Sequence, residues 1–156
     1  MTDATVDVWH TSVAGLYSGE DAALMCTSGD AQARSGRRFR GVQATDAQGR
    51  VDFDTCFPGW YRGRAIHIHF TVRRGGAEFV TSQLAFEQGL IDEVFSSHPE
   101  YALYGAPDTP NARDGILSRD LPAFLLRGER MDDGALLASK RLVVRSSLAD
   151  PLCASG

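Results

Sequence analysis

The sequence predicts an all-β fold, a β-sandwich core with one short helix and long loops. Three observations lead to this prediction. Short runs of β-branched and aromatic residues recur along the chain, with glycine- and proline-containing turns between them. A single segment has the pattern of a helix, and the chain contains no internal repeat. The 156 residues, 43% of them hydrophobic, fit one domain with a core large enough to fold alone.

Strand candidates fill the first half of the chain in order. Residues 6–9 (VDVW) are β-branched and aromatic. Residues 37–46 and 50–55 alternate polar with apolar side chains on either side of Ala-Gln-Gly, so we expect them to pair as a hairpin whose turn closes on Gly49. Residues 70–74 meet Gly75-Gly76, and residues 77–87 return as another strand.

The second half contains the helix and the longest connection. Residues 87–98 (EQGLIDEVFSSH) are predicted to be helical up to the residue before Pro99. Residues 99–115 hold three prolines and two glycines, which indicates a long loop. Residues 124–131 and 135–148 face each other across Asp132-Asp133-Gly134, a strong hairpin signal.

Charge and hydropathy argue against two classes of partner. The net charge is −4, and the basic residues are scattered except for Arg37 and Arg38, so we expect no nucleic-acid partner. No segment approaches the roughly 20 apolar residues that cross a bilayer. The first ten residues resemble neither a signal peptide nor an amphipathic presequence. We therefore expect no membrane partner.

Three cysteines, Cys26, Cys56 and Cys153, leave two interpretations open. They are too few for a disulfide scaffold and have no CxxC spacing for zinc or redox chemistry. They are either buried or idle thiols, or Cys26 and Cys56 form a bridge. Such a bridge would close a loop of about 30 residues and add roughly 3 kcal/mol of stability in an oxidising compartment.

The segment FPGWYRGRAIHIHF, residues 57–70, carries the strongest chemical signal. Side chains two apart on a strand leave the same face, with Cα atoms roughly 6.5 to 7 Å apart. His67 and His69 can then reach one metal ion through their imidazole nitrogens, while Ile66, Ile68 and Phe70 point into a core. Two histidines alone are more often ordinary surface or core residues.

Tyr61 adds to this signal. Pro58-Gly59 predicts a turn just before it, and Gly63 allows another, so the tyrosine can fold back toward the histidines. A phenol, with its pKa near 10, binds as phenolate only to a strongly Lewis-acidic ion. An anionic oxygen donor beside imidazoles favours ferric iron over zinc. The alternative is an ordinary tyrosine at a loop edge.

Arg64 lies three residues before His67 and faces away from it if the strand is already regular there. A β-bulge near Gly63 would turn Arg64 toward the metal. Otherwise Arg64 is a surface charge.

Several motifs at compatible spacings match one family. VDVWH, GLYSG, RGVQATDAQGRVDFDT, FPGWYRGRAIHIHF and TSQLAF follow one another over about residues 6 to 86. Together they resemble the intradiol ring-cleavage dioxygenases, the family of catechol 1,2-dioxygenase and protocatechuate 3,4-dioxygenase. The resemblance implies a β-sandwich catalytic core with a non-haem Fe(III) cofactor. It also implies cleavage of catechol-type diols with O2 to cis,cis-muconate-type products.

The resemblance assigns roles to six residues. The implied iron ligands are Tyr17, Tyr61, His67 and His69. Tyr61 would leave the metal and act as general base when the catechol binds. Arg64 would lie over the bound catechol, and Gln83 would line the site beside it. His10 and His98 match no ligand, and we expect them to be structural.

The resemblance also bears on domain organisation and location. Residues 1–156 would form a single catalytic domain that lacks the family's usual N-terminal segment, because five residues precede VDVW. The chain looks closest to the secreted actinobacterial and fungal members, some with polysaccharide-binding modules, which favours an extracellular location and the Cys26–Cys56 bridge. Catechol, methylcatechol, protocatechuate and hydroxylated phenylpropanoids are all candidate substrates.

Two other functions compete with this interpretation. The chain could be a non-catalytic β-sandwich binding module with a vestigial metal site. It could also be another histidine-rich metalloenzyme, such as a mononuclear copper oxidase, which would not require Tyr17 and Tyr61.

Overall fold

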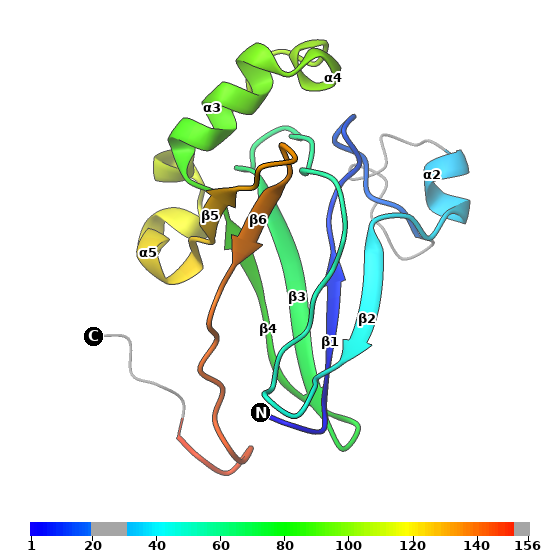
Figure 1. Cartoon of the computed structure of the whole chain (residues 1–156), viewed down its shortest axis with the longest axis vertical. Helices are drawn as coiled ribbons and strands as arrows, with labels where there is room; N and C mark the ends of the chain where they lie inside the picture. Colours follow the sequence, from blue (N-terminus) through cyan, green and yellow to red (C-terminus); the bar gives the residue numbers. More distant parts are fainter. Residues whose placement is uncertain (20–30, 152–156) are drawn as a thin grey trace.

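The computed structural model describes residues 1–19 and 31–151. Its main sheet is antiparallel, with the strand order β2-β1-β3-β4 (Figure 1). The strands are β1 (Ala4–Trp9), β2 (Arg40–Ala44), β3 (His67–Arg74) and β4 (Ala77–Ala85). β1 lies between β2 and β3, so the strand predicted at residues 6–9 is central to the sheet.

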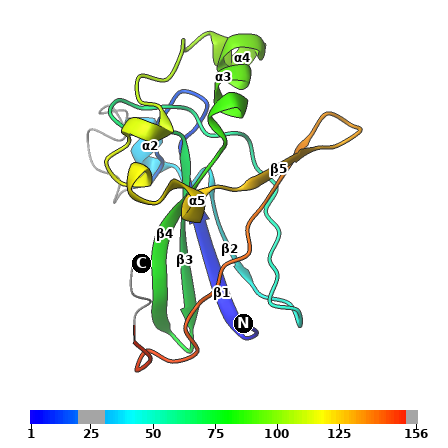
Figure 2. The ribbon, with the colours of Figure 1, turned by 90° about the vertical axis from the view of Figure 1, so that its left-hand side faces the viewer.

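A small second sheet consists of the antiparallel hairpin β5 (Arg127–Arg130) and β6 (Leu136–Ser139). It continues from the end of β4, where the backbone N–H of Leu126 donates to the carbonyl of Ala85 at 2.8 Å. Figure 2 shows β5 running out to one side of the main sheet. Antiparallel sheets with few short helices confirm the predicted all-β class. Within the described residues, the second sheet of the predicted sandwich consists of this hairpin alone.

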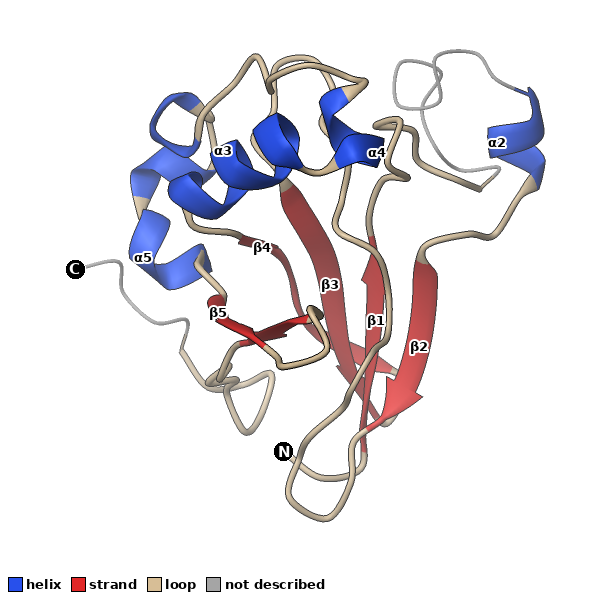
Figure 3. Cartoon of the chain, turned by 45° about the horizontal axis from the view of Figure 1, so that its top comes forward, coloured by secondary structure: helices blue, strands red, loops and turns tan. Residues whose placement is uncertain are grey.

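The helices gather beyond one end of the main sheet (Figure 3). The predicted helix at residues 87–98 is confirmed as α3 (Gln88–Ser97), which buries Ile91 and Phe95. The remaining helices are short: α2 (Ala31–Ser35), α4 (Pro99–Ala102), α5 (Leu121–Phe124) and the 3-10 turns η1 (Asn111–Arg113) and η2 (Leu117–Arg119). The predicted loop at 99–115 therefore contains α4 and η1. No described helix is long and apolar enough to cross a membrane.

Two predicted hairpins form, although the second strand of the later one ends at Ser139 rather than extending to residue 148. β3 and β4 meet at Gly75 and Gly76, whose φ values of 57° and 79° are accessible mainly to glycine. In the β5–β6 hairpin, the backbone N–H of Gly134 donates to the carbonyl of Met131 at 2.9 Å. Turn chemistry thus located both connections.

The third predicted hairpin is wrong in its partner strand. The turn at Asp46–Gly49 forms, but residues 50–55 are not a strand, and β2 pairs with β1 instead. Phe53 explains the difference, because its ring packs where a side chain on Gly41 would lie, with ring carbons 3.2 Å from an added Cβ. The returning segment therefore contacts β2 through an apolar ring rather than a backbone ladder.

The core divides at β3. Ile66 belongs to the largest cluster of buried side chains, which includes Phe86 of the β4–α3 junction and Phe95 of α3. Phe70 belongs to a second cluster, on the main sheet. The prediction that Ile66 and Phe70 point away from the histidines is confirmed, because both are at most 4% exposed within these clusters.

Candidate metal centre

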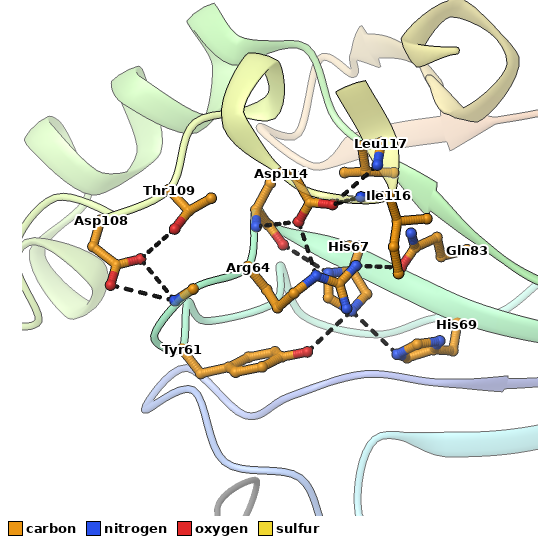
Figure 4. Close-up of polar contacts among 12 residues, drawn as sticks. Tyr61, Arg64, His67, His69, Gln83, Asp108, Thr109, Asp114, Ile116 and Leu117 are labelled. Carbon is orange, nitrogen blue, oxygen red and sulfur yellow. Dashed lines mark hydrogen bonds and ion pairs between the residues drawn. The ribbon is translucent and has the colours of Figure 1, made fainter. Parts of the chain in front are cut away.

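The four predicted metal ligands converge at one imidazole nitrogen. Nε2 of His67 lies 3.1 Å from the Tyr17 hydroxyl, 3.4 Å from the Tyr61 hydroxyl and 3.1 Å from Nε2 of His69. Figure 4 shows Tyr61, His67 and His69 pointing toward one another. No three His, Cys, Asp or Glu side chains of the described residues form a metal-binding group, so the two phenols are needed to complete this donor set.

Strand geometry places the two histidines. His67 is the first residue of β3 and His69 lies two residues further, so both leave the same face of the sheet. A bond between Nδ1 of His67 and the carbonyl of Ala65, at 2.6 Å, requires a proton on Nδ1. The lone pair of Nε2 is therefore directed at the other three donors.

Both imidazoles are neutral near pH 7. Burial lowers the pKa of His67 to about 3, and the charge of Arg64 acts in the same direction. Burial and then the charge of Arg64 lower the pKa of His69 to about 4. Neutral imidazole is the form that binds a metal, so the site needs no proton loss from either histidine.

Two interlocked loops place the tyrosines, and glycines allow the interlock. The backbone N–H of Gly59 donates to the carbonyl of Ser12 at 3.0 Å. A Cβ on Gly59 would lie 2.2 Å from the carbonyl oxygen of Val13, and one on Gly15 would lie 1.9 Å from that of Trp60. Only glycine fits such close backbone contacts. This packing holds the loop that ends in Tyr17 against the loop that carries Tyr61. Tyr61 folds back toward His67, as the turn at Pro58-Gly59 predicted.

Arg64 and Gln83 also meet, as predicted. The guanidinium Nη2 of Arg64 donates to Oε1 of Gln83 at 2.7 Å. A β-bulge near Gly63 was one of two alternatives for Arg64, and it does not form, because β3 begins only at His67 and a turn precedes it. Gly63, with φ of 82°, forms part of that turn. Strand alternation does not apply to Arg64, and its side chain reaches the face that carries His69.

Known proteins resemble this chain in sequence. No family model matches it. A chlorocatechol 1,2-dioxygenase from Pseudomonas putida is 30% identical over 57% of this chain and 37% of the relative. One from Cupriavidus pinatubonensis is 32% identical over 57% of this chain and 38% of the relative. The chain thus spans less than two fifths of the length of these curated relatives.

Solved structures resemble it in fold. A dioxygenase crystal structure superposes with a TM-score of 0.79 at 25% identity, covering 92% of this chain and 71% of that one. The relatives in sequence and this neighbour in fold are all named as dioxygenases. An intradiol dioxygenase from Tetranychus urticae (TM-score 0.77, 24% identity, covering 92% of this chain and 72% of that one) shares the fold. So does the dioxygenase domain of a carbohydrate-binding fusion from a cellulolytic Streptomyces (TM-score 0.58, 24% identity, 88% and 65% coverage).

The set of two phenols and two imidazoles is chemically suited to ferric iron. Two phenols can supply anionic oxygen, and two neutral imidazoles complete four ligands. Fe(III) with two phenolates and one hydroxide sums to zero charge, which suits a site where Tyr17 and His67 are at most 7% exposed.

Trp9 is a site residue that the sequence reasoning missed. It lies opposite His69 in the β1–β3 pair, and the two rings stack with centroids 5.0 Å apart. Arg40 lies opposite Trp9 on β2, with its guanidinium carbon 5.8 Å from the centroid of the Trp9 ring. Gln83 lies opposite His69 on β4. One row across the sheet therefore braces a predicted ligand. The motif VDVW marked a strand but gave no sign of this contact.

Asp114 is the second residue that was missed. Its Oδ2 accepts a hydrogen bond from Nε of Arg64 at 2.9 Å, although the carboxylate is fully buried. Burial alone would raise the pKa of Asp114, but backbone N–H donors and the Arg64 guanidinium together lower it to about 2. The sequence placed this residue only within a long loop, where no pattern distinguishes it.

Two histidines and two cysteines lie outside this donor set. His10 is buried, with Nδ1 at 2.7 Å from the Thr11 carbonyl and Nε2 at 2.8 Å from the Thr55 hydroxyl, consistent with the structural role expected. His98 links α3 to α4. Cys26 lies outside the described residues, and Cys56 forms no disulfide within them, so the bridge stays a prediction.

Proposed function

We propose that this chain is the catalytic domain of a non-haem Fe(III)-dependent intradiol dioxygenase. It would cleave catechol-type diols with O2 to cis,cis-muconate-type products. The observation that carries the proposal is the meeting of two phenols and two neutral imidazoles at Nε2 of His67. The names of the curated relatives, chlorocatechol 1,2-dioxygenases, support a catechol as substrate.

Tyr17, Tyr61, His67 and His69 would hold the iron. When bound, Fe(III) supplies Lewis acidity, which favours the deprotonated form of a phenol or catechol oxygen. The two tyrosines differ in their surroundings. Tyr17 is 7% exposed, whereas Tyr61 is only partly buried on the turn before β3. Tyr61 is therefore the better candidate to accept a proton from an incoming catechol at its phenolic oxygen and to swing away.

Arg64 would stabilise negative charge that develops on the diol ring. Its guanidinium carries a positive charge, and a carboxylate oxygen and an amide oxygen hold it in place. A charge that is already oriented costs no reorganisation when the reaction begins. This makes Arg64 an electrostatic catalyst in the proposed reaction.

Gln83 would present a hydrogen-bond donor beside Arg64. Its Oε1 accepts from Arg64, which fixes the orientation of the amide. Its Nε2 is buried and has no partner among the described residues. A buried donor of this kind is costly unless a ligand uses it, so we assign it to an oxygen atom of the bound substrate.

An oxygen-uptake assay tests the function. Protein loaded with Fe(III) is mixed with catechol, methylcatechol, chlorocatechol, protocatechuate and a hydroxylated phenylpropanoid. We expect at least one substrate to consume equimolar O2 and to give the ultraviolet absorption of a muconate rather than the visible absorption of a semialdehyde. Iron-loaded protein that consumes no oxygen with any of them would instead indicate a binding module with a vestigial site.

We also propose an extracellular location and a longer natural chain with a polysaccharide-binding module. Both rest on the resemblance to secreted family members, and the Streptomyces neighbour is itself named as a carbohydrate-binding fusion. Mass spectrometry of protein exported to an oxidising compartment tests the accompanying pairing of Cys26 with Cys56. Two free thiols in the exported protein would count against it.

A further inference from the structure

The buried carboxylate of Asp114 joins two segments that are distant in sequence. Its Oδ1 accepts the backbone N–H groups of Ile116 at 2.9 Å and Leu117 at 3.0 Å, within its own loop. Its Oδ2 accepts the Nε–H of Arg64 and the backbone N–H of Ala65, both at 2.9 Å. Figure 4 shows the carboxylate between η2 and the turn before β3. Each oxygen thus serves one segment.

A purely structural link between these segments would not need a charge. Burying a carboxylate costs several kcal/mol before its partners compensate for it, and the bond from Ala65 alone would connect the two loops. The additional bond from Arg64 has a different effect. It holds Nε on one side of the guanidinium while Gln83 holds Nη2, so the plane of the group is fixed by two acceptors.

The same carboxylate is connected to the predicted ligand His67. Ala65 donates its N–H to Asp114 and accepts the Nδ1–H of His67 at its carbonyl, 2.6 Å away. A shift of Ala65 would therefore turn the imidazole and redirect its Nε2. Asp114 can act on both the Arg64 guanidinium and the His67 imidazole, because its partners Arg64 and Ala65 are adjacent in the chain.

We propose that Asp114 is a positioning residue of the active site. Its carboxylate sets the orientation of the Arg64 guanidinium and, through Ala65, steadies the imidazole of His67. The inference rests on the proposed function for its catalytic consequence. The hydrogen bonds on which it depends join Asp114, Arg64, Ala65 and His67, and none of them involves a metal or a substrate atom.

The first test needs no iron. In metal-free protein, the Arg64 Nε–H signal is identified in a proton–nitrogen NMR spectrum by its loss in Arg64→Lys. We expect slower exchange with water than at exposed arginines such as Arg127, and loss of that protection in Asp114→Asn. The asparagine matches aspartate in size, but its amide nitrogen must face donors on one side or the other.

The second test measures turnover of the iron-loaded protein. We expect Asp114→Asn to retain iron while kcat falls about 10- to 100-fold, the range expected when a catalytic group is displaced by about 1 Å. KM should change less than kcat, because the proposed iron ligands and Gln83, which would bind the substrate, are unchanged. In an Arg64→Lys background the same substitution should cost little more, since the two residues act as one unit.

Asp108→Asn is the matched control. Asp108 is an exposed residue of the same loop, and its carboxylate accepts the backbone N–H of Gly63 at 3.1 Å. Asparagine keeps an oxygen for that bond, so Arg64 exchange and kcat should both match the parent protein.

The proposal fails if the Arg64 Nε–H of the parent exchanges as fast as that of exposed arginines, a result that does not depend on whether Asp114→Asn folds. It also fails if folded Asp114→Asn keeps the protection or the parental kcat. Failure of the proposed function has a different signature, namely a parent that consumes no oxygen while Arg64 is still protected.

Discussion

Trp9 and His69 stack across the β1–β3 pair with their ring planes 8° from parallel and their centroids 5.0 Å apart. The contact covers one face of an imidazole that we propose to be an iron ligand. An indole of this size limits rotation of the histidine ring and excludes water from that side. Through this stack, the central strand β1 contacts a proposed iron ligand on β3.

Trp9→Leu should therefore weaken iron binding without unfolding the chain. We expect iron affinity to fall about 10-fold, a loss typical of residues that orient metal ligands from outside. Competition with a chelator measures the affinity, and far-ultraviolet circular dichroism checks the fold. Trp9→Phe keeps an aromatic face and should retain most of the affinity. Equal affinity in the parent and in Trp9→Leu would show that the stack does not matter to the metal.

His67→Ala and Tyr61→Phe should separate two ligand roles. The alanine variant removes the nitrogen at which the four donors meet, so we expect it to lose iron. The phenylalanine variant should keep iron but differ in colour from the parent, which we expect to be red-brown from phenolate-to-Fe(III) charge transfer. Metal analysis and visible spectra measure both effects. Unchanged absorption in Tyr61→Phe would remove that residue from the ligand set.

Gly59→Ala should destabilise the protein and disturb both tyrosine loops. The added Cβ would lie 2.4 Å from the carbonyl oxygen of Ser12, a backbone atom that cannot move alone. We expect a loss above about 2 kcal/mol in the free energy of unfolding, as for other changes that overpack a rigid site. Thermal denaturation measures the loss.

Gly89→Ala provides the matched control. Gly89 lies in α3, where an added Cβ meets nothing within 4 Å. Alanine is a better helix former than glycine by up to about 1 kcal/mol, so this variant should be neutral or slightly more stable. Similar destabilisation by both substitutions would argue against the glycine interlock.

His10 should contribute to acid sensitivity. Burial lowers the pKa of His10 below its ordinary value of 6.5. In the unfolded chain this imidazole protonates near pH 6.5, whereas in the folded protein it stays neutral to lower pH. The unfolded state therefore binds more protons as pH falls, and the free energy of unfolding decreases. The stability is intact above the unfolded pKa and is lost as pH falls toward the folded pKa.

His10→Gln isolates this contribution. Urea unfolding of the metal-free protein at about pH 7.5 and about pH 5.5 should give a smaller decrease for His10→Gln than for the parent. Other buried histidines contribute equally to both proteins and cancel. His98→Gln, at an exposed position, should keep the parental decrease. A parental decrease in His10→Gln would assign the acid sensitivity to other groups.

The sequence predicted those parts of the molecule that depend on local rules. His67 and His69 share a face because strand side chains alternate, and this needs no knowledge of neighbouring strands. Gly75-Gly76 located the β3–β4 hairpin for a similar reason, since few residues tolerate positive φ. Tyr17 came from motif resemblance alone, whereas Tyr61 was also indicated by the turn expected at Pro58-Gly59.

Non-local pairing accounts for what was missed. The predicted turn at Asp46–Gly49 is correct, but turn residues do not reveal which strand β2 will join. β2 pairs with β1 rather than with residues 50–55. The stack of Trp9 on His69 requires β1 to pair with β3, and the ion pair of Arg64 with Asp114 joins residues 50 apart in the sequence. Such contacts follow from tertiary packing and leave no local pattern.

The central position of β1 has a consequence for how this chain can vary in length. One residue inserted between Thr5 and Val8 would rotate Trp9 onto the opposite side of the pleat and leave His69 without its indole. Evolution and engineering alike must then keep β1 at constant length. Additions such as epitope tags belong at the tip of the β5–β6 hairpin near Asp133, a segment that contains none of the proposed iron ligands.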